Sequence, residues 1–274
     1  MKIQTTNLPK GGGGKTTHSF NEGDWLATYK DKRVCLVDGA SECNLTQAFN
    51  VTSTKTMYDI FTTGEYEIVP IKKNLSLIRG DERLNDAQLD LASRNHKYLQ
   101  FFMWLADHYD DLAQQFDVII IDTHNDESLV TANFIAVSDI VLAVSDASKN
   151  GYRAWLQLKR FVDDIKSEAI DVITRKSYVT ATPYIIGNNI KLFGNHVSDT
   201  AKQFLAVMEE EPDYLGTIFY KELLAKSLVY DQSVFEQYQQ MTPKEQEKHQ
   251  NFYDNITYVY QHILDVLEGE THND

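Results

Sequence analysis

A glycine-rich run at residues 9–17, with the sequence PKGGGGKTT, constrains this chain more than any other feature. The run ends a β-like stretch (residues 1–8) and precedes a helix-like one (residues 18–29). Successive glycines let backbone N–H groups surround an anion, while the lysine and threonine that follow supply an ammonium group for β- and γ-phosphates and a hydroxyl for Mg²⁺. A flexible linker is the alternative, and the strand-to-helix junction argues against it. We therefore assign a nucleotide to Gly11, Gly12, Gly13, Gly14, Lys15, Thr16 and Thr17.

Two apolar runs predict buried strands that each lead to a carboxylate. Residues 33–38 (RVCLVD) end in Asp38, and residues 116–123 (FDVIIIDT) place four aliphatic residues before Asp122. Strands and helices alternate along the chain, so we predict an α/β fold with a doubly wound, mainly parallel sheet of the P-loop type. Ligands of such sheets lie beyond the carboxyl ends of the strands. The candidate Mg²⁺ ligands are therefore Thr16, Asp38 and Asp122, although a helix cap is the alternative role for Asp122.

Composition bounds the class of protein. The chain has 274 residues, of which 42% are hydrophobic, and this is enough to bury a large core. No Pro/Ser-rich linker interrupts the alternation of elements, so we expect one domain over residues 1–274. The two cysteines, Cys35 and Cys43, form no disulfide framework. Neither a signal-like N-terminus nor an apolar run of membrane length is present, and we expect a cytoplasmic protein.

Hydrophobic patterning predicts further elements. The expected strands are residues 74–78 and 184–189. The expected helices are residues 54–65, 95–116, 150–166 and 241–268. The last of the helices follows Thr242-Pro243, an N-cap with proline at the first helical position.

The glycine-rich loop carries a family resemblance. The pattern Lys-Gly-Gly-x-Gly-Lys-Thr-Thr resembles the deviant P-loop of the ParA/MinD-type ATPases, although Pro9 stands where the standard P-loop has glycine. The resemblance implies ATP and Mg²⁺ as cofactors. It also implies that Lys10 is the signature lysine, which crosses the interface of an ATP-sandwich homodimer to the partner's nucleotide. A solvated lysine on an exposed loop is the alternative.

The segment after the second strand departs from that family at one position. Residues 38–46 (DGASECNLT) resemble the family's switch pattern Asp-x-Asp-Pro-Gln-Gly-Asn-Leu-Thr, and Asp38 belongs to it. Ala40 stands where the family has the carboxylate that orients the attacking water. We therefore expect nucleotide binding with impaired hydrolysis. Two explanations stay open: an introduced replacement of aspartate, which the intact neighbouring pattern favours, or natural slow hydrolysis with a substitute such as Glu42.

Two further polar residues follow strands. The family usually has prolines after the second carboxylate, whereas this chain has His124 and Asn125. We expect His124 to be an exposed loop residue, with a general base as the alternative. The resemblance also places an asparagine at the adenine. The family's usual distance from that asparagine to a later helix, which opens here at Val197-Ser198, selects Asn189; Asn188 is the competing choice, and a turn-forming role is the alternative. The resemblance also implies strands at residues 138–144 and 217–220 and a helix at residues 221–226.

Charge is unevenly distributed along the chain. The net charge is −14, but residues 149–176 hold seven basic and four acidic residues, whereas residues 207–274 hold four basic and fourteen acidic ones. The acidic C-terminal helix argues against the basic membrane segment of MinD-like relatives, and we expect no membrane binding. The basic region is the only candidate surface for DNA, with a solvated helix face as the alternative. Its residues are Arg153, Lys159, Arg160, Arg175 and Lys176.

The resemblance implies a function. Short ParA-type ATPases form an ATP-dependent dimer, bind DNA without sequence preference and are reset when a ParB-like partner stimulates hydrolysis, which implies a nucleoid-associated protein. A metabolic P-loop ligase and an ATP-gated scaffold that positions protein cargo are the alternatives. Lys10, Lys15, Asp38 and the position of Ala40 are the candidate catalytic residues.

Overall fold

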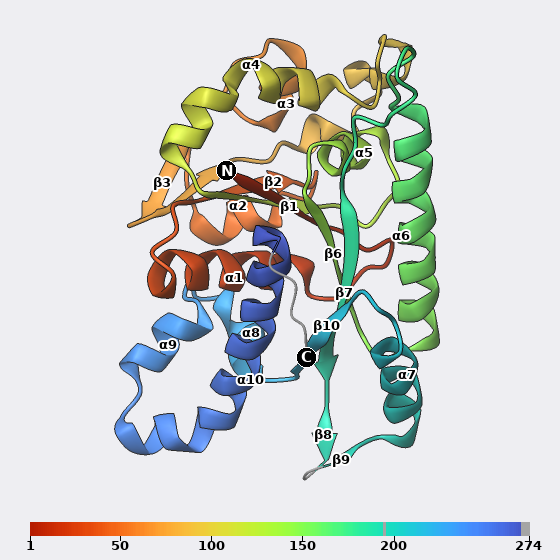
Figure 1. Cartoon of the computed structure of the whole chain (residues 1–274). Helices are drawn as coiled ribbons and strands as arrows, with labels where there is room; N and C mark the ends of the chain where they lie inside the picture. The colour runs from red at the N-terminus through yellow and green to blue at the C-terminus, as the bar shows by residue number, and fades with distance from the viewer. Residues whose placement is uncertain (194–195, 270–274) are drawn as a thin grey trace.

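One eight-stranded sheet runs through the centre of the molecule in this computed structural model, which describes residues 1–193 and 196–269 (Figure 1). Three of its strands, at residues 34–39, 118–123 and 140–145, are apolar, rich in β-branched residues and buried on both faces. In sheet order the strands are β10 (Tyr214–Phe219), β7 (Thr182–Ile190), β6 (Ile140–Ser145), β1 (Lys2–Thr6), β5 (Val118–Thr123), β2 (Val34–Gly39), β4 (Leu75–Ile78) and β3 (Val69–Lys72).

Every neighbouring pair in this sheet is parallel except β3 and β4. Strand β1 lies between β5 and β6, so the glycine-rich loop that follows it leaves the middle of the sheet. In the register of β2 and β5, Asp38 lies opposite Asp122. The doubly wound, mainly parallel P-loop fold is thereby confirmed, and its two strand-terminal carboxylates meet at one edge of the sheet.

Helices cover both faces of the sheet (Figure 1). Helices α1 and α10 pack on one face, and α4, α5 and α6 pack on the other. The helices are α1 (Lys15–Tyr29), α2 (Asn44–Phe49), α3 (Met57–Thr62), α4 (Gln100–Gln115), α5 (Leu129–Ala136), α6 (Lys149–Glu168), α7 (Asp199–Glu209), α8 (Glu222–Ser227), α9 (Val234–Gln240) and α10 (Pro243–Glu268). Three short 3₁₀ helices (Glu82–Asn85, Ala87–Leu89 and Leu91–Ser93) lie before α4, and a small antiparallel pair, β8 (Leu192–Phe193) and β9 (His196–Val197), follows β7.

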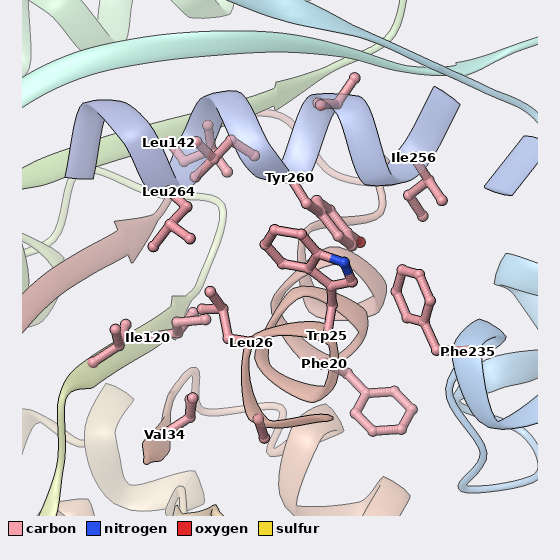
Figure 2. Close-up of a cluster of buried hydrophobic side chains, with 14 of the residues drawn as sticks. Phe20, Trp25, Leu26, Val34, Ile120, Leu142, Phe235, Ile256, Tyr260 and Leu264 are labelled. Atoms are coloured by element: carbon pink, nitrogen blue, oxygen red, sulfur yellow. The ribbon is translucent and has the colours of Figure 1, made fainter. Parts of the chain in front are cut away.

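The helix after the glycine-rich loop is held by the terminal helix. Trp25 of α1 is 1% exposed and lies 5.8 Å, centroid to centroid, from the ring of Tyr260 on α10 (Figure 2). Phe20 and Leu26 extend this apolar contact, and Phe235 of α9 closes its edge. Since α1 begins at the phosphate-binding loop, this core fixes the direction in which the loop faces.

Local sequence explains where the expected boundaries differ. The predicted helix at residues 54–65 starts only at Met57, because Thr56 and Asp59 form a capping box. The helix predicted from residue 95 starts at Gln100, and the preceding residues lie in a turn. No helix among the described residues is long and apolar enough to span a bilayer.

Candidate nucleotide-binding site

The glycine-rich loop has the geometry that a phosphate requires. A Cβ on Gly13 would lie 2.6 Å from the backbone oxygen of Val144. Gly14 has a left-handed backbone (φ 86°), and a Cβ there would lie 2.7 Å from Nδ2 of Asn188. Only glycine fits these two positions without displacing backbone or side chain, and the loop therefore lies tightly against β6 and β7. Helix α1 begins directly after it, with its N–H groups directed at the loop.

Lys15 is held at the mouth of this loop. Its side chain is nearly buried, and Nζ donates a hydrogen bond to Oδ1 of Asn125, just after β5. Burial lowers the pKa of Lys15, while the negative charges of Asp122, Glu42 and Asp126 oppose that shift. The ammonium group thus lies among carboxylates, where an anionic phosphate would compete for it.

The carboxylate of Asp122 fits a divalent cation. It is 1% exposed, its Oδ1 accepts a hydrogen bond from Ser19 at 3.2 Å, and its Oδ2 is buried without a partner among the described residues. The hydroxyl of Thr16 lies near enough to this carboxylate to oppose the rise in its pKa. An unpartnered carboxylate oxygen beside a hydroxyl suits Mg²⁺, which takes one or two protein ligands and completes its shell with water and phosphate oxygens.

Asp38, the other expected ligand, is already hydrogen-bonded within the protein. Its Oδ2 accepts bonds from the backbone N–H and the hydroxyl of Thr46, both at 2.7 Å, and its Oδ1 accepts from the N–H of Ala40 at 3.3 Å. Burial nevertheless raises its pKa to about 6. The carboxylate therefore holds the switch segment, residues 38–46, in a closed loop.

Burial raises the pKa of Asp122 to about 7, and this shift predicts a pH dependence. The folded protein holds a proton that the unfolded chain releases near the ordinary value of 3.8. The associated stability is therefore complete below about pH 4 and is lost as the pH rises through about 7. We expect urea unfolding of the Mg²⁺-free protein to show a fall in stability from pH 5 to pH 8 that Asp122→Asn reduces.

The matched control for this measurement is Asp107→Asn, because Asp107 is exposed on α4. This variant is expected to keep the parent slope. An unchanged slope in Asp122→Asn would contradict the assignment of the raised pKa to Asp122.

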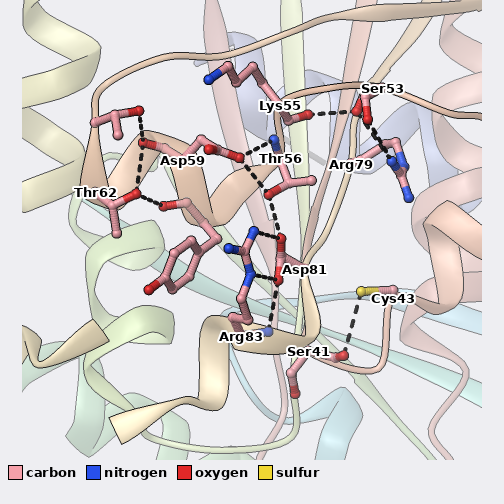
Figure 3. Close-up of polar contacts among 12 residues, drawn as sticks. Ser41, Cys43, Ser53, Lys55, Thr56, Asp59, Thr62, Arg79, Asp81 and Arg83 are labelled. Atoms are coloured by element: carbon pink, nitrogen blue, oxygen red, sulfur yellow. Dashed lines mark hydrogen bonds and ion pairs between the residues drawn. The ribbon is translucent and has the colours of Figure 1, made fainter. Parts of the chain in front are cut away.

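The switch segment is contacted by the residues that follow β4, which in turn contact the start of α3. Cys43 has a left-handed backbone (φ 53°) at the position where the family pattern has glycine, and it precedes α2. Gly80, after β4, donates its N–H to the hydroxyl of Thr46 at 2.9 Å. Beside it, Asp81 accepts hydrogen bonds from Thr56 and Arg83, both at 2.7 Å (Figure 3). Ala40 is buried in this segment and contributes only a methyl group.

Two cavities adjoin the loop. One of about 480 Å³ is lined by the loop from Gly12 to Thr17, by Asn125 and by the start of α2. The other, of about 220 Å³, lies between the loop and α8. Asn188 and Asn189 both line the second cavity. Asn188 is buried and donates to the backbone oxygen of Gly13 at 2.7 Å, whereas Asn189 is exposed with φ 58°.

The larger cavity lies at the N-terminus of α1, and the smaller one lies beside it. In a comparison with protein families, a family model described as an AAA domain matches residues 1–175, more than half of the chain. The chain belongs to this AAA-domain family. A comparison with curated protein sequences gives no significant match.

Solved structures show the fold more closely. A complex of ATP with an aspartate-to-alanine variant of McdA from Cyanothece is 21% identical, and the match covers 100% of this chain and 98% of that chain with a TM-score of 0.79. A plasmid partition protein from Borrelia burgdorferi bound to AMPPNP is 19% identical over 96% and 98%, with a TM-score of 0.71. Cobyrinic acid a,c-diamide synthase from Mycobacterium smegmatis with ADP and magnesium is 19% identical over 77% and 83%, with a TM-score of 0.64. The fold is that of the ParA/MinD-type P-loop ATPases.

In this P-loop ATPase, Lys10 is neither solvated nor directed at its own phosphate site. Its Nζ donates to Oδ1 of Asp146 at 2.5 Å and to Oγ of Ser148 at 3.1 Å, and the side chain is 24% exposed. Asp146 and Ser148 lie between β6 and α6. The lysine therefore rests in an ion pair within its own chain.

His124 lies in the loop after β5, as expected, but is only partly exposed there. Its side chain is 29% exposed, and Nε2 lies 2.8 Å from Oε1 of Glu42. Its backbone oxygen accepts a hydrogen bond from Asn7 at 2.9 Å, which anchors it to the end of β1. Sequence reasoning also missed Asn125 and Ser19. The sequence contained a signal for Asn125, because this residue stands where the family has a proline. It contained no such signal for Ser19.

The five basic residues of the predicted DNA surface differ in their surroundings. Arg153 and Arg160 are exposed on the same side of α6, seven residues apart. Lys159 is paired with Glu211 at 3.3 Å and Asp213 at 3.0 Å. Arg175 and Lys176 lie in the loop beyond the far end of α6, a helix of 20 residues and about 30 Å (Figure 1).

Proposed function

We propose that this P-loop ATPase is a ParA-type DNA-partition protein, acting as one domain over residues 1–274. It would bind ATP and Mg²⁺, form an ATP-sandwich homodimer, associate with the nucleoid in the cytoplasm through nonspecific DNA contacts, and be reset by a ParB-like partner. One observation carries the proposal: the loop has a second lysine, Lys10, whose half-buried side chain forms an ion pair with Asp146. The match to a plasmid partition protein with bound AMPPNP supports the same role.

Within one subunit, different residues would bind different parts of the nucleotide. Lys15 and the loop amides hold the β- and γ-phosphates, and the cavity between Asn188, Asn189 and α8 takes the base. Thr16 and Asp122 would hold Mg²⁺, with Asp38 in the switch beside them. When bound, that ion neutralises charge on the β- and γ-phosphates. Asn125 must release Lys15 when the phosphates enter, since the amide oxygen and the phosphate compete for the same ammonium group.

Dimer formation would use Lys10. Both side chains of the pair with Asp146 are already partly exposed, at 24% and 39%, so little rearrangement is needed to expose the ammonium group. In the sandwich dimer it would exchange the carboxylate of Asp146 for the phosphates of the partner's nucleotide. The exchange replaces one charge-assisted contact by another and therefore costs little beyond ordering the interface.

DNA binding is assigned to the exposed face of α6 that carries Arg153 and Arg160, because Lys159 is already paired with acidic residues. We expect a fluorescent random-sequence duplex to bind with ATP and not with ADP, and binding to weaken steeply with salt. Arg153→Ala combined with Arg160→Ala is expected to lower the salt slope by about 2, since each lost phosphate contact contributes about 0.9.

Arg175→Ala combined with Lys176→Ala is the matched control, with the same charge change at the far end of α6. It is expected to keep the parent slope. Equal losses in both pairs would place the DNA elsewhere. No ATP-dependent DNA binding by the parent protein would contradict the partition proposal.

In that case the candidate function becomes an ATP-gated scaffold for protein cargo or a metabolic ligase. The net charge of −14 favours a scaffold for protein cargo over nucleic-acid coating. The ligase is supported by the match to a diamide synthase, which has a lower TM-score and covers less of the chain than the other two matches.

A further inference from the structure

A contact between a carboxylate and an imidazole, Glu42 and His124, lies at the carboxyl ends of β2 and β5. Oε1 of Glu42 and Nε2 of His124 are 2.8 Å apart, with side chains 46% and 29% exposed. The two residues are 82 positions apart in sequence, so their contact is made by the pairing of β2 with β5. Neither touches the phosphate loop directly in the described structure.

The histidine of this pair is fixed in place. Its backbone is anchored by Asn7, and its Nδ1 lies 3.6 Å from Oδ2 of Asp126, so the ring sits between two carboxylates. The next residue, Asn125, accepts the hydrogen bond from Lys15. These contacts hold the His124 ring beside Glu42, so His124 can orient that carboxylate.

The glutamate of the pair lies within electrostatic reach of the phosphate site. Its charge is one of those that raise the pKa of Lys15 against the effect of burial. Lys15 is the group that holds the γ-phosphate in a P-loop. Glu42 also belongs to the switch segment, two residues after Ala40, where the family's water-orienting carboxylate is missing.

We propose that Glu42 supplies the carboxylate that is missing at Ala40, and that His124 is its positioning residue. This inference rests on the proposed ATPase function, and it favours natural slow turnover over an introduced substitution as the explanation for Ala40. The water oxygen forms the new bond to the γ-phosphorus, and the bond from phosphorus to the β,γ-bridging oxygen breaks, with its electron pair leaving on ADP. The proton of the water passes to the carboxylate of Glu42.

The test is ATP turnover at saturating MgATP for the parent protein, Glu42→Gln, His124→Gln and the double variant. Lys15→Ala measures the background rate that does not come from this site. We expect Glu42→Gln to lower kcat about 10- to 100-fold and to leave KM unchanged. His124→Gln is expected to lower kcat less, and the double variant to fall no further than Glu42→Gln. Glu82→Gln, which removes an exposed carboxylate nearby, is the matched control and is expected to keep the parent kcat.

Rescue separates catalysis from a structural role. Ala40→Asp introduced into Glu42→Gln is expected to restore kcat to at least the parent value, because a carboxylate at residue 40 makes Glu42 dispensable. Parent kcat in Glu42→Gln, an equal loss with and without Ala40→Asp, or parent turnover no higher than Lys15→Ala would each overturn the inference.

Binding of a fluorescent, slowly hydrolysed ATP analogue is measured for every variant. The Kd is expected to change less than about threefold in Glu42→Gln and His124→Gln. A Glu42→Gln variant that binds the analogue weakly would also overturn the inference, because the carboxylate would then act in binding. Absence of analogue binding by the parent protein would instead contradict the proposed function and, with it, this inference.

Discussion

Replacing Ala40 by aspartate is expected to raise ATP turnover by about 100-fold. Ala40 is buried on the switch segment, with its N–H on Asp38 and its methyl group where the family has a carboxylate. A water that lacks an acceptor must lose its proton in the transition state unaided or through a more distant group. Restoring the acceptor stabilises the transition state and leaves the binding groups unchanged, so kcat rises while KM is nearly constant.

The control for this prediction is Ala40→Asn, which has nearly the same shape and no carboxylate. It is expected to turn over no faster than the parent protein. Turnover is followed by phosphate release under saturating MgATP. Equal rates of Ala40→Asp and Ala40→Asn would show that the side chain at residue 40 does not orient the water. Residue 40 would then not have the role of the family's carboxylate.

The second large effect concerns the helix behind the phosphate loop. Trp25→Ala is expected to lower the free energy of unfolding by about 3–5 kcal/mol. Trp25 is 1% exposed, packs on Tyr260 and lies at the centre of the contact between α1 and α10 (Figure 2). Truncation removes the transfer free energy of a large side chain and leaves a cavity that two fixed helices cannot fill.

Urea unfolding measures this loss, with Tyr109→Ala as the control. Tyr109 is 43% exposed on α4, and truncation there is expected to change stability by less than about 0.5 kcal/mol. A loss below about 1 kcal/mol in Trp25→Ala would mean that α10 does not hold α1, and that the orientation of the phosphate loop depends on other contacts.

The sequence predicts the phosphate site well because its signals are local. The glycine run and the lysine at residue 15 are contiguous, and the carboxylates of Asp38 and Asp122 each close an apolar strand. Such patterns need no knowledge of which strands are neighbours. Helix α5, by contrast, was not predicted. Almost every residue in it is buried, so its sequence lacks the polar face that gives a helix its periodic pattern.

The pair of Glu42 and His124 depends instead on tertiary structure. The two residues meet because β2 and β5 are adjacent, and strand order is not readable from either segment alone. The same reason applies to the hydrogen bond between Lys15 and Asn125. Tertiary structure also decides which basic residues are available, because only the fold shows that Lys159 is paired with Glu211 and Asp213.

The most direct test of the central claim is light scattering after size exclusion, with ATP, ADP or no nucleotide. The account predicts a dimer with ATP and a monomer in the other two conditions. It also predicts that Lys10→Ala stays a monomer with ATP while still binding the ATP analogue, because Lys10 serves the partner's nucleotide. A monomer in all three conditions, or a Lys10→Ala variant that dimerises like the parent protein, would contradict it.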